Sequence, residues 1–298
     1  MGKSRGRLQV VATPIGNLDD LSARARQALE NADLIAAEDT RHTLALLQAI
    51  GVSKPLLSLH AYNEAQRIPE LLARLEAGET IVLVSDAGTP LLSDPGFELV
   101  RDAARGGYEV LAVPGPSAIT AALAVAGLPT SRFCFEGFMP AREKERRAQL
   151  ARLANEVRTL VFFEAPHRIA EMLVDLVAEF GGSRQAVVAR EMTKSYETVY
   201  RGTLEELAAR ARAEPNFQRG EITVVVEGAP EATTPVDMQL LRHAVDLLAK
   251  ELPPGRAAAI AAQLTGAKRS QAYALVTRSG ESRVDPEAST DADSAEPD

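Results

Sequence analysis

Residues 81–90, IVLVSDAGTP, decide the fold, because four apolar residues end abruptly in a loop of small and polar residues. The next six residues, LLSDPG, repeat the Ser-Asp pair. Gly and Pro account for a tight turn, but a turn alone explains less well why SDAG and SDPG follow one another. Open α/β sheets bind their ligands at the carboxyl ends of strands. We therefore expect a buried strand here, followed by a ligand-binding loop.

Two other loops follow apolar runs in the same way, TPIGN at 13–17 and PGPSA at 114–118. The first lacks the GxGxxG pattern of dinucleotide-binding loops and the GK[ST] of a P-loop, which gives little support to a nicotinamide or ATP cofactor. Short loops rich in Pro and Gly let backbone amides and carbonyls approach a ligand closely. The three loops predict a site for a compact, polar cofactor.

The first 125 residues alternate short apolar runs with segments of helical periodicity. Strands are expected near residues 8–12, 34–37, 54–59, 80–84 and 109–113. Strands that alternate with helices indicate a parallel sheet covered by helices. We therefore predict the α/β class, with an N-terminal α/β domain over residues 1–125.

The pattern changes from about residue 126. Strand-like runs recur at 133–138, 159–164, 185–190, 198–202 and 221–227, and helices separate only some of them. This predicts a second, α+β domain with a mixed sheet over 126–230. After the Pro/Thr-rich APEATTP the pattern is only helical, with a break at PPG and a turn at Gly266. Residues 236–280 are expected to form a helix-turn-helix-like extension.

Composition limits the classes of function. No apolar run approaches the roughly 20 residues of a membrane span, and no signal-peptide pattern precedes the first strand, so a cytoplasmic protein is expected. The single cysteine, Cys134, excludes an internal disulfide framework. Four histidines without paired-ligand spacing predict no metal site.

The net charge of −8 argues at first against a nucleic-acid partner. Six of the acidic residues lie in the last fourteen, DPEASTDADSAEPD, which contain no base. Residues 281–298 are therefore expected to form a disordered acidic tail. Removing six negative charges from −8 leaves the rest of the chain near −2, which allows a local basic face for nucleic acid.

Nine segments in order carry a resemblance to a known family. They are VATPIGNLDDLSARA, AEDTRHT, LHAYNE, VSDAGTPLLSDPG, VPGPSAITAAL, GFMPA, FFEAPHRI, VVAREMTKSYET and RGEITVVVEG, spread over about residues 8–229. This order resembles the tetrapyrrole methylase family of S-adenosylmethionine (SAM) enzymes, and within it the members that modify ribosomal RNA. The C-terminal helices resemble the extension of those same members. One such loop is a weak signal, whereas nine in order are specific.

The resemblance implies a two-domain tetrapyrrole methylase fold with SAM in the cleft between the domains, usually in a homodimer. The activity it implies is methylation of the ribose 2′-hydroxyl of a cytidine in the decoding region of small-subunit (16S) ribosomal RNA. Cofactor-binding residues carry over onto the three loops and the second domain as Pro14, Gly16, Asp86, Gly88, Thr89, Ser117, Ala118, Phe163, Glu164 and Ala189. Of the neighbours Phe162 and Phe163, only one can line the cleft, because successive strand residues face opposite ways.

A base that removes the hydroxyl proton typically adds about 10²–10⁴-fold to the rate. The candidates are Asp39, His60, Glu64, Glu191 and Lys194. Asp39 and Lys194 are expected nearest the 2′-oxygen, since both follow strand ends that face the cleft. A lysine acts as a base only when burial or nearby cations lower its pKa. The structural alternatives are that Asp39 pairs with Arg41 and Glu191 with Arg190.

Contact with RNA is expected to use basic side chains. They are Arg41, His42, Arg142, Lys144, Arg146, Arg147, Arg168 and, at the start of the last helix, Lys268 and Arg269. For the segment 142–147 a solvated helix face is the alternative, because Glu143 and Glu145 balance the charge. The expected partner is folded RNA or an assembled subunit, recognised by shape.

Two other functions stay open at this point. A precorrin-type SAM methyltransferase acting on a tetrapyrrole would share the fold, but it needs no helix-turn-helix extension. A non-catalytic RNA-binding assembly factor would keep SAM only as a structural ligand, and the carboxylates expected in the cleft argue against it. Detection of methyl transfer separates these functions.

Overall fold

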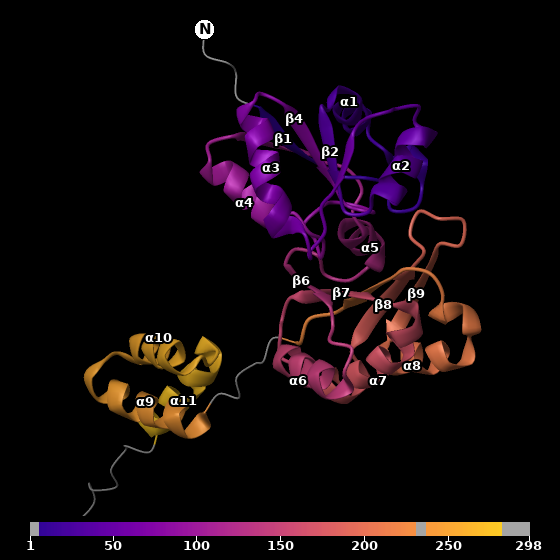
Figure 1. The fold of residues 1–298 in the computed structure, drawn as a ribbon. Helices are drawn as coiled ribbons and strands as arrows, with labels where there is room; N and C mark the ends of the chain where they lie inside the picture. Colours follow the sequence, from indigo (N-terminus) through magenta and orange to yellow (C-terminus); the bar gives the residue numbers. More distant parts are fainter. Residues whose placement is uncertain (1–5, 231–236, 282–298) are drawn as a thin grey trace, which may run out of the picture. The chain divides into compact units, whose positions relative to one another are not determined.

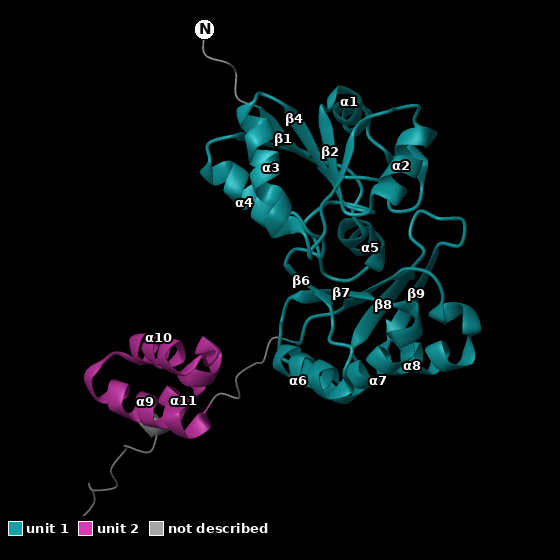
Figure 2. Cartoon of the chain, in the orientation of Figure 1, with its two compact units in different colours: residues 1–230 teal, residues 231–298 magenta. Residues whose placement is uncertain are grey.

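The computed structural model describes residues 6–230 and 237–281, which belong to two compact units. Unit 1 comprises residues 1–230 and unit 2 residues 231–298 (Figure 2). The predicted acidic tail lies outside the described residues, apart from Glu281 at the end of the last helix. Within the described ranges no helix is long and apolar enough to cross a membrane.

The first sheet of unit 1 is entirely parallel, as predicted. Its strands are β1 (Arg7–Val11), β2 (Leu34–Ala37), β3 (Leu56–Ser58), β4 (Thr80–Val84) and β5 (Glu109–Val113). Their order in the sheet is β3-β2-β4-β1-β5. The strands β4, β1 and β5 are therefore neighbours, and the loops that follow them leave the same edge of the sheet. These are the three Pro/Gly loops of the sequence.

Helices cover both faces of this sheet. Four of them are α1 (Ala23–Asn31), α2 (Thr40–Ala49), α3 (Glu64–Glu76) and α4 (Phe97–Arg105). One core cluster joins the sheet to α3 and α4 through Leu71 and Leu99, and a second joins its other face to α1 and α2 through Leu29 and Leu47 (Figure 1). Burial on both faces explains why β4 is a continuous apolar run instead of an alternating one.

The second sheet is mixed, which confirms the prediction of antiparallel neighbours. Its strands are β6 (Phe133–Phe138), β7 (Thr159–Glu164), β8 (Gln185–Arg190), β9 (Thr198–Thr203) and β10 (Ile222–Val226). In the order β6-β7-β10-β8-β9 only the β6–β7 pair is parallel. Three helices pack on one face, α6 (Glu143–Leu153), α7 (Ile169–Phe180) and α8 (Leu204–Ala213).

The helix α5 (Ala118–Ala126) connects the two sheets. Its buried residues Ile119, Ala122 and Leu123 pack against the open face of the second sheet, on Val187 and Val225. The sequence had assigned this helix to the first domain. The predicted division at residues 125/126 stays a prediction, because both sheets belong to one compact unit.

Unit 2 contains the helices α9 (Met238–Glu251), α10 (Pro254–Thr265) and α11 (Arg269–Glu281), with an apolar core of their own. Gly266 ends α10 with a φ of +69°, which confirms the predicted turn. The helix α10 begins at Pro254, within the PPG that was expected to break the helices, because a proline is well tolerated in the first turn of a helix. Short 3₁₀ helices cover Leu18–Asp20, Pro166–Arg168 and Pro215–Gln218 of unit 1.

Candidate functional site

The three Pro/Gly loops of unit 1 are joined by hydrogen bonds. The amide of Thr13 donates to the carbonyl of Gly88 over 2.9 Å, and the amide of Gly88 donates back to Thr13 over 3.0 Å. The hydroxyl of Thr89 donates to the carbonyl of Pro116 over 3.1 Å. The loops after β1, β4 and β5 therefore form one continuous wall.

This wall bounds a cavity of about 370 Å³ that lies between the two sheets of unit 1. Its other side is formed by residues of the second sheet and its loops, and the larger lining side chains are Ile15, Leu92, Phe138, Phe163, Met192 and Ile222. A volume of this order is usual for small-ligand sites. The apolar lining with a few carboxylates fits an amphipathic ligand that carries positive charge.

Backbone strain is concentrated beside the cavity. Within the described part of the chain, the non-glycine residues with left-handed φ are Leu91 (+73°), Ser93 (+74°), Glu191 (+53°) and Thr193 (+66°). They form two pairs, and the cavity is lined by residues from both of these loops, including Leu92, Ser93 and Met192. Such conformations cost free energy and cluster at functional sites. The strain is a sign of function that is independent of the motifs.

Six of the predicted cofactor residues line the cavity, namely Gly88, Thr89, Ser117, Ala118, Phe163 and Glu164. Four others do not, namely Pro14, Gly16, Asp86 and Ala189. Ala189 is fully buried in the core beneath α5, but its strand partner Thr223 lines the cavity. Pro14 is adjacent to the lining residue Ile15. Phe163, and not Phe162, is the phenylalanine that faces the ligand side.

Glu164 supplies a carboxylate oxygen without a hydrogen-bond partner. Its side chain is fully buried, and one oxygen accepts from the amide of Ala165 over 2.8 Å. The other oxygen, Oε2, has no hydrogen-bond donor among the described residues. Burial raises the pKa of Glu164, while the amide of Ala165 and the charge of Arg168 oppose the rise. Because an unpaired buried oxygen is costly, this position fits a ligand that donates a hydrogen bond.

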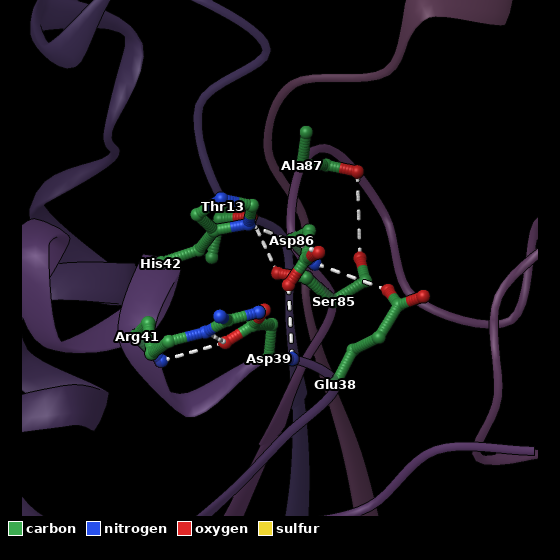
Figure 3. Close-up of polar contacts among 8 residues, drawn as sticks. All are labelled: Thr13, Glu38, Asp39, Arg41, His42, Ser85, Asp86 and Ala87. Carbon is green, nitrogen blue, oxygen red and sulfur yellow. Dashed lines mark hydrogen bonds and ion pairs between the residues drawn. The ribbon is translucent and has the colours of Figure 1, made fainter. Parts of the chain in front are cut away.

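An acidic cluster lies at the carboxyl ends of β2 and β4 (Figure 3). Asp86 accepts from the amide of Asp39 over 3.0 Å and lies 3.1 Å from Nδ1 of His42. Its own amide donates to Glu38 over 3.3 Å. The pKa of Glu38 is raised by burial, lowered by this hydrogen bond, and raised again by the charges of Asp86 and Asp39. Within the described residues no group of three or more acidic, His or Cys side chains is arranged to hold a metal ion.

Asp39 has the structural role that the sequence left open. It is the N-cap of α2 and accepts from the amide of Arg41 over 2.8 Å, and its carboxylate contacts the guanidinium over 2.5 Å. These hydrogen bonds to Arg41 hold the pKa of Asp39 well below its usual range. A carboxylate with so low a pKa is a weak proton acceptor.

Lys194 extends from the loop between β8 and β9 toward the first loop. Its ammonium lies 2.9 Å from Glu191 and 3.2 Å from Glu221, and its side chain covers Gly16. Burial alone would lower the pKa of Lys194, but the hydrogen bonds and charges of Glu191 and Glu221 raise it above its ordinary value. This is opposite to the direction that a lysine base requires. The pairing of Glu191 is thus with Lys194, not with Arg190.

Glu64 and His60 lie away from the cavity lining. Glu64 is buried in the first turn of α3 and accepts from the amide of Leu99 over 3.2 Å, which satisfies an amide of the first turn of α4. Its role is therefore to hold two helices together.

The basic residues predicted to bind RNA separate into exposed and buried groups. Arg146 is only 2% exposed, and its guanidinium lies 2.6 Å from Asp175 on α7. The prediction that Arg146 contacts RNA is therefore wrong, and its charge serves the core of unit 1. Arg168 donates to the carbonyls of Met139 and Pro140 and is mostly buried. The residues that stay exposed are Arg41, His42, Arg142, Lys144, Arg147, Lys268 and Arg269.

Three residues that line the cavity were not predicted from the sequence, Asp94, Met192 and Glu221. Asp94 is the most notable of them. Burial raises its pKa to about 6; a hydrogen bond with Ser85 opposes the rise, and the charges of Glu38 and Asp86 add to it. The signal that could have found Asp94 is the repetition of the Ser-Asp pair eight residues after the first. Its context, SDPG, has the composition of an ordinary turn.

Comparisons with known proteins agree with this fold. The family of Tetrapyrrole (Corrin/Porphyrin) Methylases matches residues 7–208, and the RsmI C-terminal HTH domain matches residues 236–278. The Ribosomal RNA small subunit methyltransferase I of Xylella fastidiosa (strain Temecula1) is 52% identical over 90% of this chain and 98% of its own. The protein of the same name from Pseudomonas aeruginosa is 49% identical over 91% of this chain and 96% of its own.

Solved structures of lower sequence identity share the fold. The methyltransferase CobJ has a TM-score of 0.56 at 22% identity, over 75% of this chain and 95% of its own. The uroporphyrin-III-C-methyltransferase from Thermus thermophilus has a TM-score of 0.51 at 20% identity, over 75% of this chain and 94% of its own. These similarities cover about three quarters of the chain and concern architecture alone.

Proposed function

The chain belongs to the tetrapyrrole methylase family, and we propose that it is a SAM-dependent methyltransferase of small-subunit (16S) ribosomal RNA. The observation that carries this proposal is the match, at about half identity over nine-tenths of the chain, to ribosomal RNA small subunit methyltransferase I proteins. The finer part of the proposal is the acceptor. It is the ribose 2′-hydroxyl of a cytidine in the decoding region.

The cavity of unit 1 fits SAM in size and in chemistry. Phe163, Ile15 and Met192 offer an apolar wall for adenine, and the unpaired oxygen of Glu164 can accept from an amino group or a ribose hydroxyl. The acidic cluster around Asp86, formed with Glu38 and Asp39, favours a ligand that carries a sulfonium and an ammonium group. When bound there, SAM supplies a methyl carbon that is activated by its bond to a positive sulfur.

The chain's own residues would position the acceptor and exclude water. The loop that carries Lys194 contacts the loop of Gly16 and so covers one side of the ligand-binding region. Arg41 and His42 at the start of α2 contact Asp39 and Asp86, but most of each side chain is exposed and can also meet phosphates of the RNA. In unit 2, Arg269 begins α11 and Lys268 directly precedes it, at a helix start where backbone amides and cations favour phosphate.

The helix-turn-helix match favours RNA over a tetrapyrrole. A macrocycle substrate makes no use of unit 2, whereas residues 236–278 match a domain that is named after the RNA-modifying members.

A homodimer of the 31.9 kDa chain is part of the same proposal. Light scattering tests it, and a mass near that of a single chain would contradict it.

The test is transfer of labelled methyl from SAM to small ribosomal subunits that lack the modification, with free 16S RNA and a porphyrinogen as parallel acceptors. We expect label in the subunit RNA and none in the tetrapyrrole. Label in the tetrapyrrole alone would contradict the proposal, and label in neither would favour the non-catalytic alternative.

A matched pair of variants on α5 tests the cofactor site. Ala118 lines the cavity, whereas Ala124 is exposed on the same helix. Ala118→Leu is expected to fill part of the cavity and weaken SAM binding at least tenfold, and Ala124→Leu should leave the affinity unchanged. Calorimetric titration of both variants with SAM measures this. Equal affinities would place the cofactor elsewhere.

A further inference from the structure

Methyl transfer to a hydroxyl group of the RNA requires a base that removes the hydroxyl proton. Three carboxylates line the cavity, those of Asp94, Glu164 and Glu221. Two of them have cationic partners. Glu164 lies 3.3 Å from Arg168, and Glu221 lies 3.2 Å from Lys194. No ion pair joins Asp94 to a basic side chain of the described residues. The charged groups that act on its pKa are Glu38 and Asp86, both acidic.

The loop that carries Asp94 is held in one conformation from both ends. Leu91 and Ser93 have left-handed φ, and Gly96 follows with a φ of +113°. A side chain at Gly96 would place its Cβ 2.7 Å from Leu83 of β4, so the loop lies tightly on the first sheet. Ser93 approaches the second sheet at Gly137, where an added Cβ would lie 3.1 Å from its hydroxyl oxygen. The loop therefore spans the two sides of the cavity at the position of Asp94.

We propose that Asp94 is the general base that accepts the proton of the acceptor hydroxyl. The inference rests on the proposed function and deepens it. The 2′-oxygen forms a bond to the methyl carbon as the carbon–sulfur bond breaks, and the electron pair of that bond stays on sulfur. The O–H bond breaks in the same process, and its proton passes to a carboxylate oxygen of Asp94. The carboxyl then releases the proton to water.

The acid strength of Asp94 suits this role. A base works best when its pKa lies near the working pH, and burial raises the pKa of Asp94 to about 6, with the charges of Glu38 and Asp86 adding to the rise. Near neutral pH the group is thus mostly ionised, yet much more basic than an ordinary aspartate. The pKa values of Asp39 and Lys194 are shifted in directions that disfavour a base. The pKa of Asp39 is lowered, which makes its carboxylate a weak proton acceptor, and the pKa of Lys194 is raised, which keeps its amine protonated.

The experiment compares wild type with Asp94→Asn in single-turnover methylation at saturating SAM and small subunits, between pH 5 and pH 9. We expect the wild-type rate to rise with pH to a plateau, with an apparent pKa near 6. Asp94→Asn is expected to lose about 10²–10⁴-fold and this pH dependence, while the affinity for SAM, measured by calorimetry, stays within about threefold. A variant rate within threefold of wild type at pH 7.5 would overturn the inference. A loss confined to SAM affinity would overturn it as well, and would make Asp94 a ligand of the cofactor.

A second variant keeps the inference testable if Asp94→Asn folds poorly. Glu38→Gln removes one negative charge that faces Asp94 and leaves the carboxyl in place. It should shift the acidic limb of the pH–rate profile to lower pH without abolishing methylation, and an unchanged limb would count against Asp94. Should wild type methylate no RNA, the proposed function fails by itself. Carbon-13 NMR titration of the Asp94 carboxyl then still tests its basicity, and a pKa near 4 would overturn the inference.

Discussion

The side chain of Lys194 lies directly on Gly16. A Cβ atom on residue 16 would come within 2.3 Å of Cγ of Lys194, and the backbone of Gly16 has a φ of +151°. This contact joins the strained loop after β8 to the first loop after β1, and therefore links the second sheet to the first. It also places the ammonium of Lys194 beside Glu221 in the cavity wall.

Gly16→Ala tests this contact. The added methyl group must displace Lys194 and with it the loop of residues 191–197, so we expect a loss of about tenfold or more in methylation, since small misplacements at a reacting site are costly. Gly51→Ala is the matched control, because Gly51 also has a positive φ of +74° but has nothing within 4 Å of an added Cβ. If both variants lose the same activity, the cause is backbone strain and not the contact with Lys194.

Lys194→Met tests whether Lys194 acts as a base or as a fixed cation. The pKa of Lys194 is raised by Glu191 and Glu221 against the opposing effect of burial. While both glutamates are ionised, its ion pairs therefore contribute full stability at any pH below the ordinary lysine pKa of about 10.4. That contribution is lost as the pH rises through the still higher folded value, or as acid protonates the carboxylates. We expect Lys194→Met to lower the unfolding temperature by the same amount at pH 6, 7.5 and 9. A methylation defect that changes between pH 6 and pH 8 would instead show that Lys194 titrates there.

Arg146→Ala should destabilise the protein severely. Its guanidinium is 2% exposed and pairs with the buried Asp175, and removal of one partner of a buried ion pair costs about 3–5 kcal/mol. Lys144→Ala, two residues away on the same helix, removes an exposed charge and should change the free energy of unfolding by less than about 0.5 kcal/mol. Urea unfolding of both variants measures the difference. Similar midpoints for the two variants would contradict the structural role of Arg146.

Asp39→Asn should retain most of the methylation rate. Asparagine caps helices about as well as aspartate, so the N-cap of α2 is preserved while the charge that pairs with Arg41 is lost. We expect a rate within about fivefold of wild type at saturating substrates, because a general base contributes far more than that. A loss above a hundredfold with unchanged SAM affinity would make Asp39 the base and contradict the role given to Asp94.

Lys268→Ala/Arg269→Ala tests the contribution of unit 2 to RNA binding. Both side chains are exposed at the start of α11. If each neutralises one phosphate, the slope of the logarithm of affinity against the logarithm of salt concentration should fall by about 0.7 per residue on single-stranded RNA. The control Arg242→Ala/Lys250→Ala removes two exposed cations from α9 of the same unit. An equal fall in both double variants would mean that only the general charge of unit 2 matters.

The sequence predicted the elements of the fold well, because its apolar runs and its turns are clearly separated. It did not predict the strand order, and only that order explains why three loops distant in sequence form one wall after β4, β1 and β5. It also assigned α5 to the first domain, although its apolar face packs on the second sheet. Tertiary pairing of this kind leaves no local pattern.

The sequence predicted those residues of the cavity wall that belong to recognisable motifs. It missed or misassigned residues whose role depends on their three-dimensional environment. Gly88, Ser117 and Phe163 line the cavity as expected. Arg146 looked like part of a basic surface, because its partner Asp175 lies 29 residues further along the chain. Asp94 looked like a turn residue, because its raised pKa depends on burial and on the charges of Glu38 and Asp86.

The most direct test of the account is the stability to alkali of the RNA that receives labelled methyl. Alkali cleaves RNA by attack of the 2′-oxygen on the adjacent phosphate, so a methylated 2′-oxygen protects its own linkage. After methylation of small subunits and complete alkaline hydrolysis, the account predicts label in one dinucleotide that begins with cytidine. Label recovered only in mononucleotides would show methylation of a base, and would contradict the proposed transfer to the ribose.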